Sequence, residues 1–215
     1  MKSVAGKHVL ITGAAMGMGR LFAERALAER AASVVLLDVD ERALNATLDD
    51  LAADADTDTP TPTQLSGYIV DVSDADAVAD TAAAVLDEVG HIDVLVNNAG
   101  VVRGNHYFWE TDLERDAKFT IDVNTRAPMY VAHAFLPGMI AASGDCRMLN
   151  LASAAGFTPN PRMAVYAASK WAMIGWSFPS SSTRNVAFGS SSLTVPGNSS
   201  SSSLAMRPLS PGLAR

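Results

Sequence analysis

The sequence predicts an α/β fold, in which a doubly wound parallel sheet is covered by helices on both faces to give three layers, α/β/α. The first indication is a series of short, continuously apolar runs such as residues 33–38 (SVVLLD), because buried strands of parallel sheets read this way. The second is that segments of helical length follow these runs, since strands alternating with helices imply βαβ units. The third is that glycine- and asparagine-rich motifs come directly after strands, at the edge where such sheets bind ligands.

The individual elements follow from this alternation. The predicted strands are residues 8–11, 33–38, 68–70, 92–96 and 147–151, and the predicted helices are residues 21–30, 41–53, 74–89, 112–140 and 164–176. Residues 54–64 are rich in Asp, Thr and Pro and are expected to form a surface loop. We expect Ser73 to cap the helix that follows it and Pro128 to break the long helix.

Length and composition indicate what kind of protein carries these elements. A chain of 215 residues, 48% hydrophobic and 18% charged, is typical of a globular domain, so residues 1–215 are interpreted as a single domain. A net charge of −7 argues against sequence-independent nucleic-acid binding. No apolar run has the length of a signal peptide or a membrane span. These features predict a cytoplasmic protein with no nucleic-acid or membrane partner.

The cysteine and the histidines do not suggest a metal centre. Cys146 is the only cysteine, so it can form no internal disulfide, and no Cys/His metal spacing is present. His8, His91, His106 and His133 show no grouping typical of metal ligands. We expect them to be surface or packing residues and expect no bound metal.

The first motif with a chemical meaning is residues 12–19 (TGAAMGMG), which follow a strand and open a helix. In that position glycines let the backbone turn tightly and approach a pyrophosphate, and the helix N-terminus offers unpaired N–H groups. The loop therefore predicts dinucleotide binding of the Rossmann type. Cofactor contacts are expected at Gly13, Ala15, Met16, Gly17, Met18 and Gly19.

An acidic residue at the end of the next strand predicts which dinucleotide is bound. Asp38 lies 19 positions beyond Gly19, where a carboxylate can accept hydrogen bonds from the adenosine ribose hydroxyls and repel a 2′-phosphate. Val39, rather than a basic residue, follows it. Both features favour NAD over NADP. The alternative is that Asp38 only begins a turn with Asp40.

Two further strand ends are candidate cofactor contacts. Asp71, followed by Val72, lies where a carboxylate can face the adenine amino group, but a turn formed with Ser73 explains it equally well. The fourth strand is followed by small residues that let the backbone pass close to a ribose. The expected contacts there are Asn98, Ala99 and Gly100.

The candidate catalytic pair is Tyr166 and Lys170, which lie four apart and so share one face of a helix. A tyrosine with an ordinary pKa of about 10 needs neighbouring positive charge to exchange protons at neutral pH. Lys170 supplies such a charge. Ser153, just after the fifth strand, can polarise a carbonyl oxygen. A Tyr-x-x-x-Lys pair alone is common on helix surfaces, so it indicates a catalytic site only together with the other motifs.

Taken together, these motifs resemble those of the short-chain dehydrogenase/reductase family, over about residues 5–178. The family's TGxxxGxG corresponds to residues 12–19, its NNAG to residues 97–100 and its active-site asparagine to Asn124. Its serine corresponds to Ser153, and its YxxxK begins thirteen residues later at Tyr166, which is the usual interval.

The resemblance implies a role for each catalytic residue. Tyr166 would be the general acid/base, and Lys170 would lower its pKa and bind the nicotinamide ribose. Ser153 would orient the substrate oxygen, and Asn124 would hold a water that links Lys170 to solvent.

The function expected from this resemblance is NAD-dependent transfer of a hydride between a secondary alcohol or ketone and nicotinamide. The partner would be a small-molecule alcohol or carbonyl substrate, and the protein would form a homo-oligomer, a tetramer or dimer. The alternatives are a non-catalytic nucleotide-binding protein, and an epimerase or dehydratase on the same scaffold. The fold does not identify the substrate.

Residues 179–215 depart from the family pattern. This segment is rich in serine, with five in a row at 199–203, and Pro179 interrupts what should still be helix. Residues 193–197 are the candidate for the sixth strand, with Pro196 and Gly197 beside the nicotinamide. Three explanations are open: a truncated or frameshifted product, a poorly assigned sequence, or a divergent substrate lid. We favour the first two.

Two segments are candidates for the substrate pocket. Residues 106–109 (HYFW) follow the fourth strand and either line the substrate mouth or form an aromatic cluster that covers the core. Between Ser153 and Tyr166, residues 159–161 (PNP) are expected to form a pocket wall. Ala155, Phe157 and Met163 suggest a fairly apolar substrate.

Overall fold

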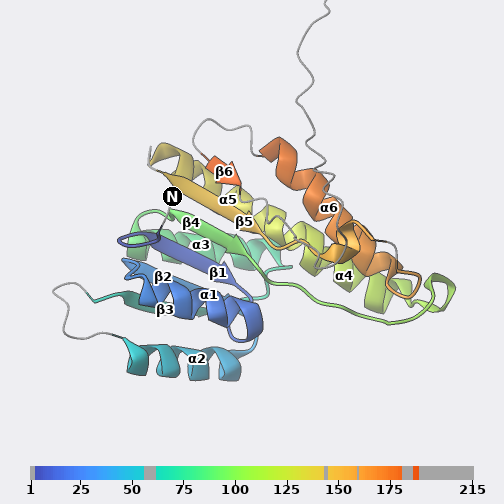
Figure 1. The fold of residues 1–215 in the computed structure, drawn as a ribbon, viewed down its shortest axis with the longest axis horizontal. Coiled ribbons are helices and arrows are strands. Elements are labelled where there is room, and N and C mark those ends of the chain that lie inside the picture. Colours follow the sequence, from blue (N-terminus) through green and yellow to red (C-terminus); the bar gives the residue numbers. More distant parts are fainter. Residues whose placement is uncertain (1–2, 56–61, 143–144, 159, 181–185, 189–215) are drawn as a thin grey trace, which may run out of the picture.

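The computed structural model describes residues 3–55, 62–142, 145–158, 160–180 and 186–188. Its centre is a six-stranded parallel sheet with the strand order β3-β2-β1-β4-β5-β6 (Figure 1). The strands are β1 His8–Thr12, β2 Ser33–Asp38, β3 Gln64–Ile69, β4 Val94–Asn97, β5 Cys146–Asn150 and β6 Val186–Phe188. The chain runs outward from the centre in both directions, so the predicted doubly wound α/β fold is confirmed.

Helical segments connect the strands. The α-helices are α1 Gly17–Ala28, α2 Glu41–Asp54, α3 Ala75–Val89, α4 Phe119–Ile121, α5 Ala127–Ala141 and α6 Ala164–Ser180. Two π-helical segments, η2 Leu113–Lys118 and η3 Asp122–Arg126, continue directly into α4 and α5. Short 3-10 turns lie at η1 Phe108–Glu110 and η4 Ala154–Gly156.

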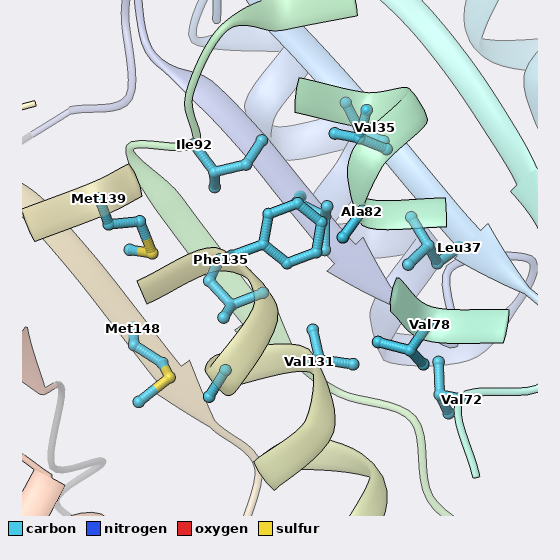
Figure 2. Packing of buried hydrophobic residues seen from close by; sticks show 14 of the residues in the cluster. Val35, Leu37, Val72, Val78, Ala82, Ile92, Val131, Phe135, Met139 and Met148 are labelled. Carbon is cyan, nitrogen blue, oxygen red and sulfur yellow. The ribbon is translucent and has the colours of Figure 1, made fainter. Parts of the chain in front are cut away.

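The sheet separates two apolar clusters, because successive residues of a strand point to opposite faces. On β1, Val9 and Ile11 pack with residues of α1 and α2, whereas Leu10 packs on the other face with residues of α3 and α5. Phe135 of α5 is 1% exposed and lies at the middle of the second cluster, as Figure 2 shows. Both faces of the sheet are therefore covered, which gives the predicted three layers.

The prediction that Pro128 breaks the long helix is wrong. Helical residues run without interruption from Leu113 to Ala141, and Pro128 lies in the first turn of α5. Proline removes the hydrogen bond to the carbonyl four residues earlier. The preceding segment η3 is π-helical and already departs from that bonding pattern, so the chain stays helical through the proline.

The third strand is longer than predicted and starts inside the expected loop. Its side chains on one face, Gln64, Ser66 and Tyr68, all donate hydrogen bonds to Glu88 of α3, over 2.6, 2.9 and 2.5 Å. Burial and the adjacent Glu88 carboxylate raise the pKa of Tyr68 to about 12, so its hydroxyl stays a donor. These polar bonds, rather than an apolar run, hold this edge strand against α3.

The N-cap of α3 also differs from the prediction. Asp74, not Ser73, is the cap, and its carboxylate accepts hydrogen bonds from the N–H groups of Asp76 and Ala77. The hydroxyl of Ser73 instead donates to Asp71 Oδ1 over 2.7 Å. A carboxylate is a favourable cap because its negative charge interacts with the positive end of the helix.

The carboxyl-terminal elements differ from the prediction in their bounds. Helix α6 ends at Ser180, beyond the expected end at Trp176 and beyond Pro179. The sixth strand of the described residues is β6, Val186–Phe188, which pairs with β5. Residues 193–197, where the sixth strand was predicted, lie outside the described residues. The predicted cofactor contacts Pro196 and Gly197 lie outside the described residues.

One buried carboxylate at the amino end of the sheet, Asp93, is expected to contribute to the stability of the fold. Asp93 is 4% exposed and accepts hydrogen bonds from His8 N–H, at 2.9 Å, and Lys7 Nζ, at 3.0 Å. Burial alone would raise the pKa of Asp93, but these hydrogen bonds outweigh it and hold the pKa below its usual value. The folded state therefore favours the charged form of Asp93.

We predict that Asp93→Asn lowers the free energy of unfolding at pH 7 by about 1–3 kcal/mol, because two partly buried donors lose a charged acceptor. A carboxylate with a depressed pKa stabilises the fold above its unfolded-state pKa of about 3.9, and this contribution is lost as the pH falls through the folded-state value. Urea unfolding should thus show a constant difference between the two proteins from pH 7 to about pH 5, and a shrinking difference as the pH falls below about 4. The exposed Asp80→Asn is the control, and an Asp93 effect independent of pH would contradict the assignment.

Candidate active site

The turn between β1 and α1 requires glycine at two positions, for different reasons. Gly17 has a φ of +56°, in the left-handed region where L-residues are strained. A Cβ added at Gly19 would lie 2.0 Å from the Gly13 carbonyl oxygen. Gly17 thus allows the backbone to turn, and Gly19 allows the loop to contact the helix closely, as the motif predicts.

The N-terminus of α1 is free to receive an anion. Its N-cap residue is Met16, whose side chain makes no capping hydrogen bond, and the first turn contains no acidic residue. The first N–H groups of a helix have no intrahelical partner and carry the positive end of the helix dipole. Because Met16 and Met18 line the adjoining pocket, these groups fit the pyrophosphate of a dinucleotide.

The asparagine after β4 braces the glycine loop. Asn98 Nδ2 donates to the carbonyl oxygens of Thr12, at 2.9 Å, and Gly13, at 2.8 Å. The hydroxyl of Thr12 in turn accepts hydrogen bonds from the backbone N–H groups of Asn98 and Ala99. The side-chain amide of Asn98 therefore holds the glycine loop in place, a role that the position of Asn98 at a strand end did not indicate.

A pocket of about 490 Å³ lies at the carboxyl ends of β1, β2 and β4. Ten of the predicted cofactor residues line it: Gly13, Met16, Met18, Asp38, Val39, Asp71, Val72, Asn98, Ala99 and Gly100. The sequence analysis missed five apolar lining residues: Leu37, Val70, Val101, Phe119 and Val123. For Leu37, Val70 and Val101 the only available signal was a position at or near a predicted strand end, where apolar residues also suit the core. Phe119 and Val123 lie in the long helical segment, and no sequence motif marked them as pocket residues.

The remaining predicted contacts of the loop lie elsewhere. Ala15, Gly17 and Gly19 do not line this pocket, and Ala15 is 3% exposed. The backbone of Ala15 nevertheless contributes, because its N–H donates to Asp38 and its carbonyl accepts from Thr47. These three residues therefore determine the backbone conformation of the loop without lining the pocket.

The two carboxylates at strand ends each form a local turn while lining the pocket. Asp38 accepts hydrogen bonds from the backbone N–H groups of Ala15, at 2.9 Å, and Asp40, at 3.1 Å. Asp71 Oδ1 accepts from both the backbone and the hydroxyl of Ser73. The turn interpretation is thus observed at both positions. It is compatible with ligand binding, because a carboxylate can accept further hydrogen bonds.

A second pocket of about 210 Å³ contains the candidate catalytic pair. Its lining residues are Met18, Asn98, Gly100, Val101, Val102, Leu151, Ala152, Tyr166 and Lys170. Four of these, Met18, Asn98, Gly100 and Val101, also line the larger pocket. The two pockets are therefore adjacent parts of one cleft, which runs from Asp38 to Tyr166.

Lys170 is a buried cation at the floor of this cleft. It is 5% exposed, and its Nζ donates to the carbonyl oxygen of Leu151 over 2.8 Å. The ammonium lies 5.8 Å from the centroid of the half-buried Tyr166 ring. Burial lowers the pKa of Lys170, because desolvation disfavours its charged form. The spacing of four residues along α6 brings the two side chains together as predicted.

Asn124 is 1% exposed, and its side chain is fixed by the protein itself. Its Nδ2 donates to Val101 O and to Ser169 Oγ, and its Oδ1 accepts from Val101 N–H over 2.7 Å. Ser169 Oγ then donates to the Tyr166 carbonyl oxygen over 2.7 Å. Asn124 lies in π-helical η3, a local geometry that is frequent at functional sites.

Ser153 is held beside α6 by close packing. It caps the short turn η4, and its Oγ accepts a hydrogen bond from Ala155 N–H over 3.2 Å. In the same turn, a Cβ on Gly156 would lie 3.0 Å from the Lys170 carbonyl oxygen. The absence of a side chain at Gly156 lets this turn, and so Ser153, approach the helix that carries Tyr166. Ser153 and Asn124 are not among the lining residues of either pocket.

The aromatic segment after β4 lies on the surface. Tyr107 and Trp109 stack with ring centroids 4.8 Å apart, and Trp109 is 78% exposed. The interpretation of this cluster as a cover for the core is therefore wrong. Arg162 donates to the Asn105 carbonyl, and its guanidinium lies 5.7 Å from the Tyr107 ring centroid. The segment thus contacts the loop that precedes Tyr166.

Other classes of site receive no support from the described residues. They contain no cluster of three or more His, Cys, Asp or Glu side chains suited to a metal ion. Cys146 is buried, and burial raises the pKa of its thiol. No helix in the described part of the chain has the length and apolar character needed to cross a membrane.

The strand order, the open N-terminus of α1 and the cleft define a doubly wound α/β protein of the nucleotide-binding class. A family model described as short chain dehydrogenase matches residues 7–181. The chain belongs to this family.

Individual relatives agree with this membership. Estradiol 17-beta-dehydrogenase 11 of Rattus norvegicus is 35% identical over 175 residues, which cover 81% of this chain and 55% of the relative. Epidermal retinol dehydrogenase 2 of Mus musculus is 37% identical over 175 residues, which cover 81% of this chain and 53% of the relative. The chain thus spans about half the length of the curated relatives it matches.

Solved structures of the family share the fold. A short chain dehydrogenase/reductase from Burkholderia phymatum in complex with NAD has a TM-score of 0.79 and 32% identity, covering 88% of this chain and 66% of that one. A metagenomic short-chain oxidoreductase in complex with NADP has a TM-score of 0.73 and 32% identity, covering 84% of this chain and 77% of that one. Structures similar to this chain therefore bind either nicotinamide dinucleotide.

The brace formed by Asn98 can be tested directly. We predict that Asn98→Ala lowers the free energy of unfolding by about 1–3 kcal/mol and weakens NAD binding, because the Thr12 and Gly13 carbonyls lose their donor and the loop is no longer held. Chemical denaturation and calorimetric titration measure the two effects. Asn45→Ala, on the exposed side of α2, is the matched control. Unchanged NAD affinity in Asn98→Ala would show that the brace does not shape the site.

Proposed function

We propose that this protein is an NAD-dependent oxidoreductase that transfers a hydride between a secondary alcohol or ketone and nicotinamide. The observation that carries the proposal is the continuity of the cleft. Tyr166 and Lys170 line one end, and Met18, Asn98 and Gly100 join that end to the pocket at the glycine loop. A proton-transfer pair therefore lies beside a site fitted for a dinucleotide.

The residues present fit such a cofactor. The N-terminus of α1 would receive the pyrophosphate, Asp38 would bind the adenosine ribose hydroxyls, and Lys170 would bind the nicotinamide ribose. When bound, the nicotinamide would supply or accept the hydride. The carboxylate of Asp38 lines the pocket and is held by Ala15 N–H, which supports a preference for NAD.

Tyr166 is proposed as the general acid/base. In the direction of reduction its hydroxyl would donate a proton to the substrate oxygen, and in oxidation its phenolate would take that proton back. The Lys170 side chain lies beside this residue, with its Nζ 5.8 Å from the centroid of the Tyr166 ring. Since burial also lowers the pKa of Lys170, that group is suited to pass a proton onward.

Ser153 and Asn124 are proposed to support this exchange. Ser153 would donate a hydrogen bond to the substrate oxygen and so orient it toward Tyr166. Both N–H donors of the Asn124 side chain are already used by Val101 and Ser169. A water linking Lys170 to solvent would therefore bond to the backbone at Asn124 rather than to its amide nitrogen.

The substrate is proposed to be apolar. Val101, Val102, Leu151 and Ala152 line the pocket around Tyr166, so a polar substrate would find few partners there. Relatives of this chain are named for estradiol and retinol, which are largely apolar alcohols. A panel of apolar secondary alcohols, compared with sugar alcohols, tests this proposal.

The alternatives predict different products. A non-catalytic nucleotide-binding protein would bind NAD without turning over any alcohol. An epimerase or dehydratase would convert substrate without net formation of reduced nicotinamide. Absorbance of reduced nicotinamide together with product analysis separates the three. The location in the cytoplasm and assembly as a tetramer or dimer stay predictions, which fractionation and light scattering check.

We predict that Tyr166→Phe lowers kcat by about 100-fold or more, because the ring is kept but the proton donor is removed. Calorimetry should show that NAD affinity changes little. Tyr130→Phe, a half-buried tyrosine on α5, is the matched control and should keep its turnover. Turnover that survives in Tyr166→Phe would remove this residue from the mechanism.

We predict that Asp38→Asn lowers the ratio of kcat/KM for NAD to that for NADP by about tenfold or more. The amide still accepts a hydrogen bond from a ribose hydroxyl but no longer repels a 2′-phosphate. The ratio is measured with both cofactors at saturating substrate. The exposed Asp49→Asn, on α2, controls for the loss of one negative charge. Equal efficiency of both cofactors in the unmodified protein would overturn the NAD preference.

A further inference from the structure

Two methionines at the mouth of the cleft are unusually open to solvent. Met16 is 59% exposed and Met18 is 54% exposed. Both line the larger pocket, and Met18 also lines the pocket that contains Tyr166. A thioether is apolar and flexible, and oxidation converts it into a polar, chiral sulfoxide. These two side chains are therefore both accessible to an oxidant and placed against the proposed cofactor.

The other sulfur atoms of the described chain are shielded. Met139, Met148 and Met173 are at most 1% exposed, and Met129 and Met163 are partly buried. Cys146 is fully buried, so its thiolate is both scarce and inaccessible. Among the sulfurs of the described residues, an oxidant in solution would consequently meet those of the glycine loop first.

We propose that Met16 and Met18 form a peroxide-sensitive modification site that regulates cofactor binding. Each thioether attacks the O–O bond of hydrogen peroxide, so that an S–O bond forms, the sulfur is oxidised by two electrons, and the peroxide is reduced to water. The product is methionine sulfoxide, which a methionine sulfoxide reductase can return to the thioether. The effect on binding rests on the proposed function, whereas the selectivity of oxidation does not.

The position of the pair explains why oxidation would weaken binding. Met16 caps α1 and Met18 lies in its first turn, beside the N–H groups proposed to receive the pyrophosphate. A sulfoxide oxygen there is a strong acceptor, which can compete for those N–H groups and places partial negative charge beside the phosphates. It also removes apolar contact area from the cleft. We expect NAD affinity to fall by about five- to tenfold.

The first experiment treats the ligand-free protein with a limited amount of hydrogen peroxide and maps sulfoxides by peptide mass spectrometry. We expect modification at Met16 and Met18 well before Met139, Met148 and Met173, and slower modification when saturating NAD is present. Equal rates at exposed and buried methionines would overturn the proposed site. The preference for Met16 and Met18 over the buried methionines needs no turnover and is expected even if the protein binds no NAD, whereas the protection by NAD requires binding.

The second experiment compares NAD affinity, by calorimetry, before and after peroxide treatment of each protein. The unmodified chain should lose five- to tenfold in affinity and recover it with methionine sulfoxide reductase, whereas a Met16→Leu/Met18→Leu double variant should be insensitive to peroxide. Met129→Leu, which leaves the loop unchanged, is the matched control and should remain sensitive. A double variant as sensitive as the parent would overturn the regulatory role. Absence of NAD binding before treatment would instead refute the proposed function.

Discussion

The geometry of the cleft depends on one carbonyl group, that of Gly13. Its oxygen accepts a hydrogen bond from Asn98 Nδ2 over 2.8 Å, and it lies so close to α1 that a Cβ on Gly19 would approach it to 2.0 Å. This single group therefore joins the end of β1, the first turn of α1 and the end of β4. Because the larger pocket lies between these three elements, a side chain at Gly19 or the loss of the amide at Asn98 would change its shape.

A second set of polar contacts fixes the helix that carries Tyr166. Lys170 Nζ donates to the Leu151 carbonyl, and two turns later Ser177 Oγ accepts a hydrogen bond from Asn150 Nδ2 over 3.0 Å. Asn150 Oδ1 in turn accepts from Asn97 Nδ2 over 2.8 Å. The rotation of α6 about its axis is thus set by the ends of β4 and β5. Polar residues at strand ends act here on the helix that carries Tyr166, and the buried Lys170 ammonium is tolerated because it is hydrogen-bonded to a backbone carbonyl.

Sequence patterns predicted those parts of the protein that depend on residues close together in the chain. The glycine loop, the apolar strands at its sides and the spacing of Tyr166 and Lys170 each depend on residues close together in the sequence. The length of β3 was not predictable, because a carboxylate on a different element, Glu88, holds its polar face. The π-helical course around Pro128 and the contribution of Phe119 to the pocket likewise depend on tertiary packing. Sequence periodicity does not report such contacts.

The charges around the cleft determine how it could attract an anionic ligand. Among the residues that line the two pockets, Lys170 is the single cation, and burial disfavours its charge. Attraction to a pyrophosphate would therefore come mainly from backbone N–H groups at the start of α1, whose partial charges do not titrate and are already in place. The larger pocket is lined by two carboxylates, Asp38 and Asp71, and by no Lys or Arg side chain, so it is unsuited to a ligand that carries an additional negative charge there. A 2′-phosphate near Asp38 would meet a carboxylate and no lining cation, so the scarcity of basic side chains, as much as Asp38 itself, supports selectivity for NAD.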